Sequence, residues 1–320
     1  MSRSRATYAT VIFALLLYGF WAEVNRSGIV ANLGGHVGSA FLCFGLLLGV
    51  LWGFGFGADA MRDWLISPVA RVMAPSALVI PYLVFALPRG EFRWTFAAGL
   101  ALFPVALAAL LEYFKLEQKF TWQDCVALLA IALVLELRVF SGAWPYGGLG
   151  SLPKLYLADI ALYLYLIVRR LGGMGFSFVP RLSDLAIGVR EWLFFLPLAL
   201  GLGFALHFIR FVPRHPSAMQ VVGALLVTFL LTAVPEELFF RGILQNLLEP
   251  QVGRLKALVV SACLFGLSHF HKGAAFNWRY VILASIAGLF YGRAWRARRH
   301  LFASSLTHTL VDVVWSLWFR

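Results

Sequence analysis

Two adjacent carboxylates and an arginine follow a long apolar run, and their types and spacing are suited to chemistry. The stretch TAVPEELFFRGILQN, residues 232–246, carries Glu236, Glu237 and Arg241 directly after VVGALLVTFLL. Glu237 and Arg241 are four residues apart with the acid first, which is the favourable order for an ion pair on a helix. Glu236 is rotated by about 100° around the same helix and faces elsewhere. Because charge at membrane depth is costly, Glu236 is a candidate for a functional role.

Pro235 leaves two interpretations of this stretch open. A proline inside a helix removes one backbone donor and frees the carbonyl four residues earlier, here that of Leu231. Alternatively, a span over residues 218–234 ends at the cytoplasmic face and a helix begins at Pro235, with both acids in its first turn. The second interpretation needs no catalytic role for either glutamate.

Polar residues in two later apolar segments favour the functional interpretation. The stretch LFGLSHF contains His269, and SLTHTLVDVVW places His308 and Asp312 four residues apart on one helix face. A partly desolvated carboxylate is suited to act as general base toward water near neutral pH, and a histidine can pass a proton to a leaving amine. These residues together predict hydrolysis by an activated water molecule.

The composition predicts the elements that position these residues. The chain has 320 residues, of which 61% are hydrophobic and only 13% are charged. Soluble domains carry about 25% charged residues, and a soluble fold could not cover so much apolar surface. We therefore predict an all-α, polytopic transmembrane helical bundle of about eleven spans, near residues 8–24, 36–58, 73–88, 94–113, 124–140, 153–168, 191–212, 218–247, 257–271, 279–293 and 301–319.

The basic residues predict orientation within the lipid bilayer. The net charge of +12 comes from short basic clusters between apolar runs, such as Lys115 with Lys119 and RAWRARRH at 293–300. Their asymmetry predicts a cytoplasmic N-terminus, and the pattern does not favour nucleic-acid binding. The three cysteines have no CxxC spacing and predict neither a disulfide framework nor a thiolate metal site.

One mixed segment divides the chain. Residues 176–192, FSFVPRLSDLAIGVREW, combine an apolar stripe with four charged residues, which predicts an amphipathic helix at the membrane interface. It separates an N-terminal transmembrane region, residues 1–170, whose role the sequence does not indicate, from a C-terminal domain, residues 176–320.

Three motifs of the C-terminal domain resemble those of a known family. EELFFR, FGLSH and HTLVD are similar, in order, to the EExxxR, FxxxH and HxxxN/D motifs of the CAAX protease and bacteriocin-processing family. That family includes the type II CAAX prenyl endopeptidases and many bacterial intramembrane proteins. The resemblance covers about residues 176–320 and implies a multi-pass endopeptidase of the bacterial cytoplasmic membrane. It would hydrolyse a peptide bond of a membrane-associated protein or peptide.

The resemblance also implies a role for each site residue. Glu236 would activate water with the assistance of His269, His308 and Asp312 would stabilise the oxyanion, and Glu237 with Arg241 would form a supporting ion pair. The prenyl endopeptidases have Asn at the last position, whereas Asp312 cannot donate a hydrogen bond unless it is protonated. Asp312 would instead orient His308, or ligate a divalent metal such as zinc together with Glu236, His269 and His308. A glutamate-type and a metal-dependent protease both stay open.

Two further hypotheses belong to other functional classes. A non-catalytic scaffold or immunity protein of the same family would keep the Glu237–Arg241 pair without needing Glu236 or His269. A proton-coupled transporter would also contain buried acids and histidines, but such transporters show related halves, and the sequence contains no internal repeat.

Overall fold

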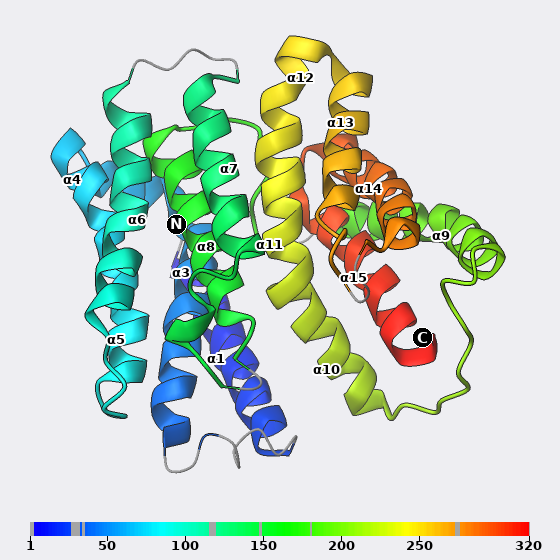
Figure 1. Cartoon of the computed structure of the whole chain (residues 1–320), viewed down its shortest axis with the longest axis horizontal. Coiled ribbons are helices and arrows are strands. Elements are labelled where there is room, and N and C mark those ends of the chain that lie inside the picture. The colour runs from blue at the N-terminus through cyan, green and yellow to red at the C-terminus, as the bar shows by residue number, and fades with distance from the viewer. Residues whose placement is uncertain are drawn as a thin grey trace. The chain divides into compact units, whose positions relative to one another are not determined.

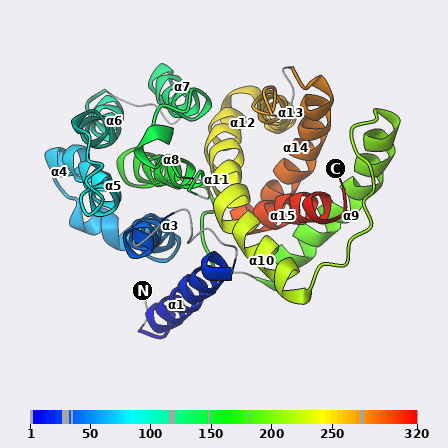
Figure 2. The same ribbon diagram turned by 60° about the horizontal axis from the view of Figure 1, so that its bottom comes forward.

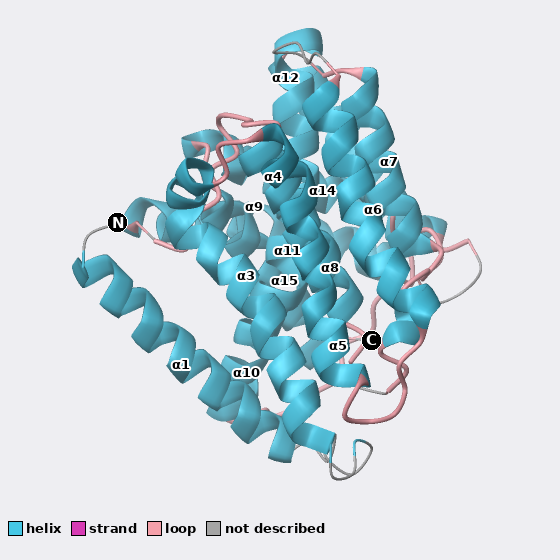
Figure 3. Ribbon diagram, turned by 90° about the vertical axis from the view of Figure 1, so that its left-hand side faces the viewer, coloured by secondary structure: helices cyan, strands magenta, loops and turns pink. Residues whose placement is uncertain are grey.

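The computed structural model describes residues 3–26, 33, 36–114, 120–146, 149–179, 181–272 and 276–319. Within these ranges the regular structure is helical, with only an isolated bridge between Phe211 and Phe319 in place of any strand, and Figure 3 shows helices joined by loops. The predicted all-α class is confirmed. Lys115 and Lys119, which contributed to the predicted orientation, lie outside the described residues.

The chain divides into two compact units, residues 1–172 and 173–320. The first unit contains a partly buried ion pair, Arg71 with Glu112, and a buried one, Arg169 with Asp124. Asp124 also accepts the backbone N–H of Thr121 and so caps the helix that follows. The α-helices of this unit are α1 (Arg3–Arg26), α3 (Val37–Trp64), α4 (Pro68–Met73), α5 (Ile80–Ala86), α6 (Trp94–Tyr113), α7 (Trp122–Glu136) and α8 (Leu152–Leu162).

The second unit contains all of the predicted site residues. Its helix α15 packs against α9, α10 and α14, and Figure 2 shows α15 in the middle of the unit. The helices are α9 (Leu182–Ala205), α10 (Ala218–Thr228), α11 (Val234–Glu237), α12 (Asn246–Val252), α13 (Arg254–Leu267), α14 (Trp278–Arg298) and α15 (Leu301–Trp318).

The helix that carries the two glutamates continues through Pro235. Residues 218–252 form one apolar helical stretch, visible as the long ribbon α10–α11–α12 in Figure 1. Wide π-helical turns, Phe229–Ala233 and Leu238–Gln245, lie on either side of α11. The Val234 N–H donates to the Phe229 carbonyl five residues earlier, and this altered register lets the helix pass a residue without an N–H. The alternative in which a span ends at residue 234 is therefore wrong.

The separate interfacial helix predicted over residues 176–192 is also wrong. Residues 176–179 are not helical, and α9 runs without a break from Leu182 to Ala205. The Asp184 carboxylate accepts the Arg181 backbone N–H at 3.1 Å and closes the first turn. The helix continues past Pro197, so the mixed segment and the apolar run that follows form one element.

Five of the described helical stretches are long and apolar enough to cross a membrane: Val37–Ala58, Pro68–Ala86, Trp94–Tyr113, Leu182–Ala205 and Ala218–Val252. A shorter apolar helix, Thr7–Trp21, accompanies them. These stretches fit a multi-pass integral membrane protein. The other predicted spans coincide with helices α7, α8, α13, α14 and α15, and the count of eleven stays a prediction.

Candidate active site

Glu237 has three polar side-chain partners in the second unit. Its side chain is fully buried, and its Oε2 atom lies 3.2 Å from Nε of Arg241. The Ser304 hydroxyl donates to the same oxygen. Its Oε1 atom lies 3.0 Å from Nδ1 of His308. Three groups from α15 and from the glutamate's own helix therefore share one carboxylate, which is how a buried acid is stabilised.

Arg241 is fully buried as well, and the surroundings of its guanidinium are aromatic. Its Nη2 atom donates to the Gly288 carbonyl at 3.0 Å. Its central carbon lies 4.7 Å from the centre of the Phe265 ring and 5.5 Å from that of Tyr291. A guanidinium interacts favourably with such aromatic rings. The positive charge of Arg241 is paired with the carboxylate of Glu237.

His308 links the two glutamates. Since Glu237 already accepts from Ser304 and pairs with Arg241, its oxygen acts as an acceptor toward His308, and Nδ1 carries a proton. The other ring nitrogen, Nε2, lies 3.9 Å from Oε2 of Glu236 and 3.4 Å from Oδ2 of Asp312. Nδ1 of His308 therefore faces Glu237, whereas Nε2 faces Glu236 and Asp312.

Two tyrosines hold the rings of the two histidines. Tyr291 is stacked on His308, with ring centres 4.6 Å apart and planes inclined by 15°. Tyr280 lies 4.7 Å from the ring centre of His269. Phe265 contacts both histidine rings, at 4.8 Å from His269 and 5.5 Å from His308. These contacts fix the planes of both imidazoles.

His269 lies just past the C-terminal end of α13. Its Nδ1 atom is 2.8 Å from the Phe265 carbonyl and 3.2 Å from the Ser268 hydroxyl. A carbonyl only accepts, so Nδ1 carries the proton and Nε2 is the acceptor of the ring. The sequence places His269 inside a span, whereas the structure places it in the turn that ends the helix.

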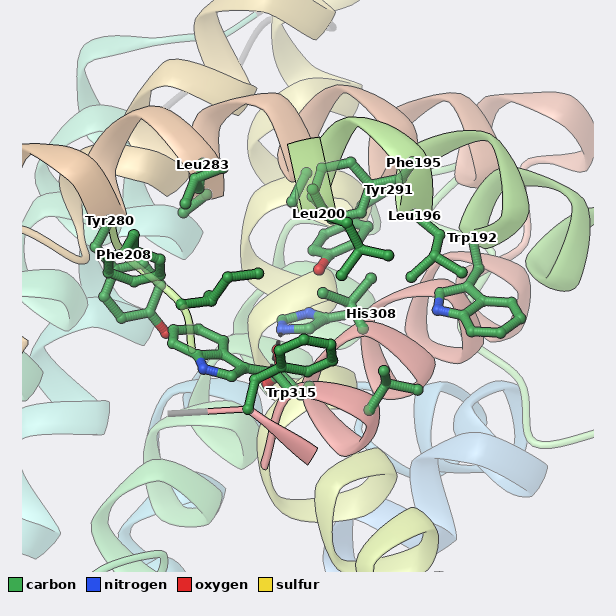
Figure 4. Close-up of a pocket in the computed structure, with 18 of the residues that line it drawn as sticks. Trp192, Phe195, Leu196, Leu200, Phe208, Tyr280, Leu283, Tyr291, His308 and Trp315 are labelled. Atoms are coloured by element: carbon green, nitrogen blue, oxygen red, sulfur yellow. Dashed lines mark ion pairs between the residues drawn. The ribbon is translucent and has the colours of Figure 1, made fainter. Parts of the chain in front are cut away.

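A cavity of about 90 Å³ adjoins these residues. His269, His308 and Asp312 line it, together with apolar and aromatic side chains from α9, α14 and α15. Figure 4 shows His308 between Tyr291 and Trp315. Trp192 lies at one end of the cavity, and Tyr280 and Phe208 lie at the other. Glu236 is not among the lining residues; its side chain is 14% exposed, and its Oε2 atom lies 3.9 Å from Nε2 of His308, which does line the cavity.

Glycines allow the helices around the cavity to approach closely. A Cβ atom added at Gly266 would lie 2.5 Å from the Val281 carbonyl oxygen and 1.9 Å from the Ser285 hydroxyl. A Cβ atom added at Gly288 would lie 3.1 Å from the Arg241 guanidinium. Gly266 is therefore required for the packing of α13 on α14, and Gly288 lets Arg241 lie close to the backbone of α14.

The four possible metal ligands are grouped in part: Nε2 of His308 lies 3.9 Å from Glu236 and 3.4 Å from Asp312. In the part of the chain that the structure describes, no group of three or more His, Cys, Asp or Glu side chains is arranged to hold a metal ion. His269 directs its protonated Nδ1 atom at a backbone carbonyl and His308 directs Nδ1 at Glu237, which leaves Nε2 of each ring available as a ligand. A metal role for Glu236, His269, His308 and Asp312 stays a prediction, and no step of the proposed reaction depends on a metal.

The structure thus brings together most of the predicted site. The Glu237–Arg241 ion pair is present, and His308 lies beside Glu236, Glu237 and Asp312. His269 lines the same cavity as His308 and Asp312. Two contributors were missed from the sequence, Ser304 and Tyr291. Ser304 had a detectable signal, because it precedes His308 by four residues on the same helix face, whereas Tyr291 had none.

Residues 218–314 match the family model described as Type II CAAX prenyl endopeptidase Rce1-like. The match runs from α10 to α15 and includes Glu236, Glu237, Arg241, His269, His308 and Asp312. No curated protein and no solved structure matches the chain.

Proposed function

Because the chain belongs, through its C-terminal unit, to the CAAX protease family of intramembrane hydrolases, we propose that it is an endopeptidase in which Glu236 activates the attacking water. Its substrate would be a membrane-associated protein or peptide. The apolar walls of the cavity support this substrate class, and nothing in them requires a prenyl group.

The observation that carries the proposal is the different surroundings of the two adjacent glutamates. Glu237 is fully buried and is shared by Arg241, Ser304 and His308. Glu236 is partly exposed and lies 3.9 Å from the nitrogen of His308 that is directed away from Glu237. A general base needs access to water and to a proton relay; Glu236 has a partly exposed side chain beside His308, whereas Glu237 is fully buried.

The proposed reaction begins with water held near Glu236 and the His308 ring. Glu236 takes one proton while the water oxygen attacks the carbonyl carbon of the scissile bond, which gives a tetrahedral intermediate with a negatively charged oxygen. An N–H of His308 stabilises that oxygen. The carbon–nitrogen bond then breaks, and the leaving amine receives the proton from Glu236, with His269 assisting the transfer.

Asp312 has an orienting role in this proposal. Its Oδ2 atom lies 3.4 Å from Nε2 of His308, and a carboxylate at that distance favours a protonated imidazole and fixes its direction. This role does not require Asp312 to donate a hydrogen bond, so it agrees with the presence of Asp where the prenyl endopeptidases have Asn.

A comparison of protein termini in membranes tests the proposal. Cells would carry the wild type, Glu236→Gln, or the matched control Glu136→Gln, which makes the same change at an exposed position of α7. We expect a small set of new termini that is present with the wild type and the control and absent with Glu236→Gln. Identical termini in all three membranes, at equal protein levels, would refute proteolysis through Glu236.

The completeness of the Glu237 network supports a second candidate, a non-catalytic scaffold of the same family. Arg241, Ser304 and His308 satisfy Glu237 without any contribution from Glu236. A scaffold would tolerate Glu236→Gln in every assay, so the same experiment separates the two candidates.

We also propose that the N-terminus is cytoplasmic and that substrates reach the cavity from that side. The basic cluster at 293–300 supports this orientation. Single cysteines introduced at Arg298 and at Arg214, in a background without the natural cysteines, would report it through labelling with an impermeant maleimide. We expect labelling at position 298 only after the inner face is opened, and labelling at that position in intact cells would reverse the orientation.

A further inference from the structure

Two arginines outside the candidate active site are held side by side by one buried acid. Glu191 on α9 is 1% exposed, and each of its two carboxylate oxygens forms an ion pair with a different arginine. Arg190 places Nη2 2.8 Å and Nε 3.2 Å from Oε1. Arg293, on α14, places Nε 3.2 Å from Oε2. A residue from each of two packed helices is thus fixed by the same carboxylate.

Both guanidinium groups keep donors directed outward. The Arg190 side chain is 52% exposed and that of Arg293 is 49% exposed. Among the described residues, no protein acceptor forms a hydrogen bond with Nη1 of Arg190 or with either terminal nitrogen of Arg293. Phe290 supports the second guanidinium, whose central carbon lies 5.3 Å from the ring centre. The cluster carries one net positive charge, because two arginines share one acid.

The position of this cluster on α9 indicates the level of the lipid headgroups. Residues 192–205 of α9 contain no Asp, Glu, Lys or Arg, so the charged part of the helix ends at Glu191. One turn further, Leu193 and Phe194 are exposed on the face that carries Arg190. In a membrane span, charged side chains lie at the headgroup level and exposed apolar ones face the acyl chains.

We propose that Arg190 and Arg293, positioned by Glu191, bind the phosphate of an anionic membrane lipid whose acyl chains lie along Leu193 and Phe194. Guanidinium groups present paired N–H donors that match phosphate oxygens in a way that an ammonium group does not. Fixing both groups beforehand lowers the entropy that is lost on binding. This site is independent of the proposed protease activity.

The test uses the purified full-length protein in detergent, titrated with dioleoyl phosphatidylglycerol. Bound lipid is counted by native mass spectrometry. Dioleoyl phosphatidylcholine, with the same acyl chains and no net charge, and inorganic phosphate are the comparison ligands. We expect phosphatidylglycerol to bind more tightly than either. Equal binding of the two lipids, or binding of inorganic phosphate in place of lipid, would overturn the assignment.

The variants separate a defined site from general charge attraction. Each arginine near a membrane surface contributes about 1 kcal/mol, which is about a five-fold change in affinity, so Arg190→Gln/Arg293→Gln should bind phosphatidylglycerol about 25-fold more weakly. Arg279→Gln, at the other end of α14, is the matched control and should bind as the wild type does. Equal losses in the control and the double variant would contradict the proposal.

A charge-conserving variant completes the test and does not depend on the stability of the double glutamine variant. Arg190→Lys/Arg293→Lys keeps the net charge and loses the planar donors, so we expect a several-fold loss of affinity. Unchanged affinity in this variant would show that charge alone attracts the lipid and would overturn the proposed site.

Discussion

Replacement of Glu237 by Gln should destabilise the second unit far more than the same change at its neighbour Glu236. The Glu237 carboxylate is fully buried, and it is the partner that neutralises the Arg241 guanidinium at 3.2 Å. Without it, Arg241 keeps the Gly288 carbonyl and its ring contacts but remains a buried, uncompensated cation.

The expected magnitude follows from that burial. Removing one partner of a buried ion pair costs about 3–5 kcal/mol, because the remaining charge is left in a low-dielectric environment. Glu236 is 14% exposed, and Glu236→Gln keeps its shape, so a cost of about 1 kcal/mol or less is expected there.

Unfolding in detergent, followed by intrinsic tryptophan fluorescence, measures both variants. A double-mutant cycle with Arg241→Met identifies the cause. When the cation has been removed, Glu237→Gln should cost less by about 1–3 kcal/mol than it does in the wild type. Equal stability losses for Glu237→Gln and Glu236→Gln, or independent effects of positions 237 and 241, would refute the division of roles between the two glutamates.

Three further predictions concern packing, pH and metal. Gly266→Ala should lower the free energy of unfolding by about 1–3 kcal/mol, because the new methyl group would meet a backbone carbonyl and Ser285. Gly223→Ala, with open space around it, is the control. Equal melting temperatures of the two variants would contradict the expectation. Burial lowers the pKa of His300, which lies 3.1 Å from Asp184. The unfolded chain therefore binds a proton that the folded chain does not, and stability should fall as the pH drops below about 6.5; melting curves of His300→Gln should show a weaker dependence, and parallel curves would contradict this. Chelators should leave peptide cleavage unchanged, because the proposed reaction uses Glu236 and no metal ion; loss of activity that added zinc restores would contradict this.

The sequence predicted the membrane class, and two of the contacts among the candidate site residues, because their signals are local. The apolar composition requires a helical bundle, and the i, i+4 spacing alone places Glu237 beside Arg241 and His308 beside Asp312. Contacts between helices were not predictable in this way. The Nδ1 atom of His308 binds Glu237, 71 residues earlier, and no spacing rule relates those positions.

The errors have physical causes of the same kind. Pro235 usually interrupts a helix, but flanking π-helical turns change the hydrogen-bond register and let it continue. Arg190 and Glu191 made residues 176–192 resemble a surface helix, whereas Glu191 is buried between two arginines from different helices. A change of hydrogen-bond register overrode the local preference at Pro235, and packing between helices overrode it at Glu191.

The central claim is that Glu236 activates water while Glu237 maintains the fold. The most direct measurement is the cleavage rate of a substrate identified from the membrane termini, with purified wild type and Glu236→Gln reconstituted in the same lipid. We predict that kcat falls by a factor of about 10²–10⁴, the range for loss of a general base, while the melting temperature stays close to that of the wild type. A Glu236→Gln protein that cleaves at the wild-type rate would contradict the account.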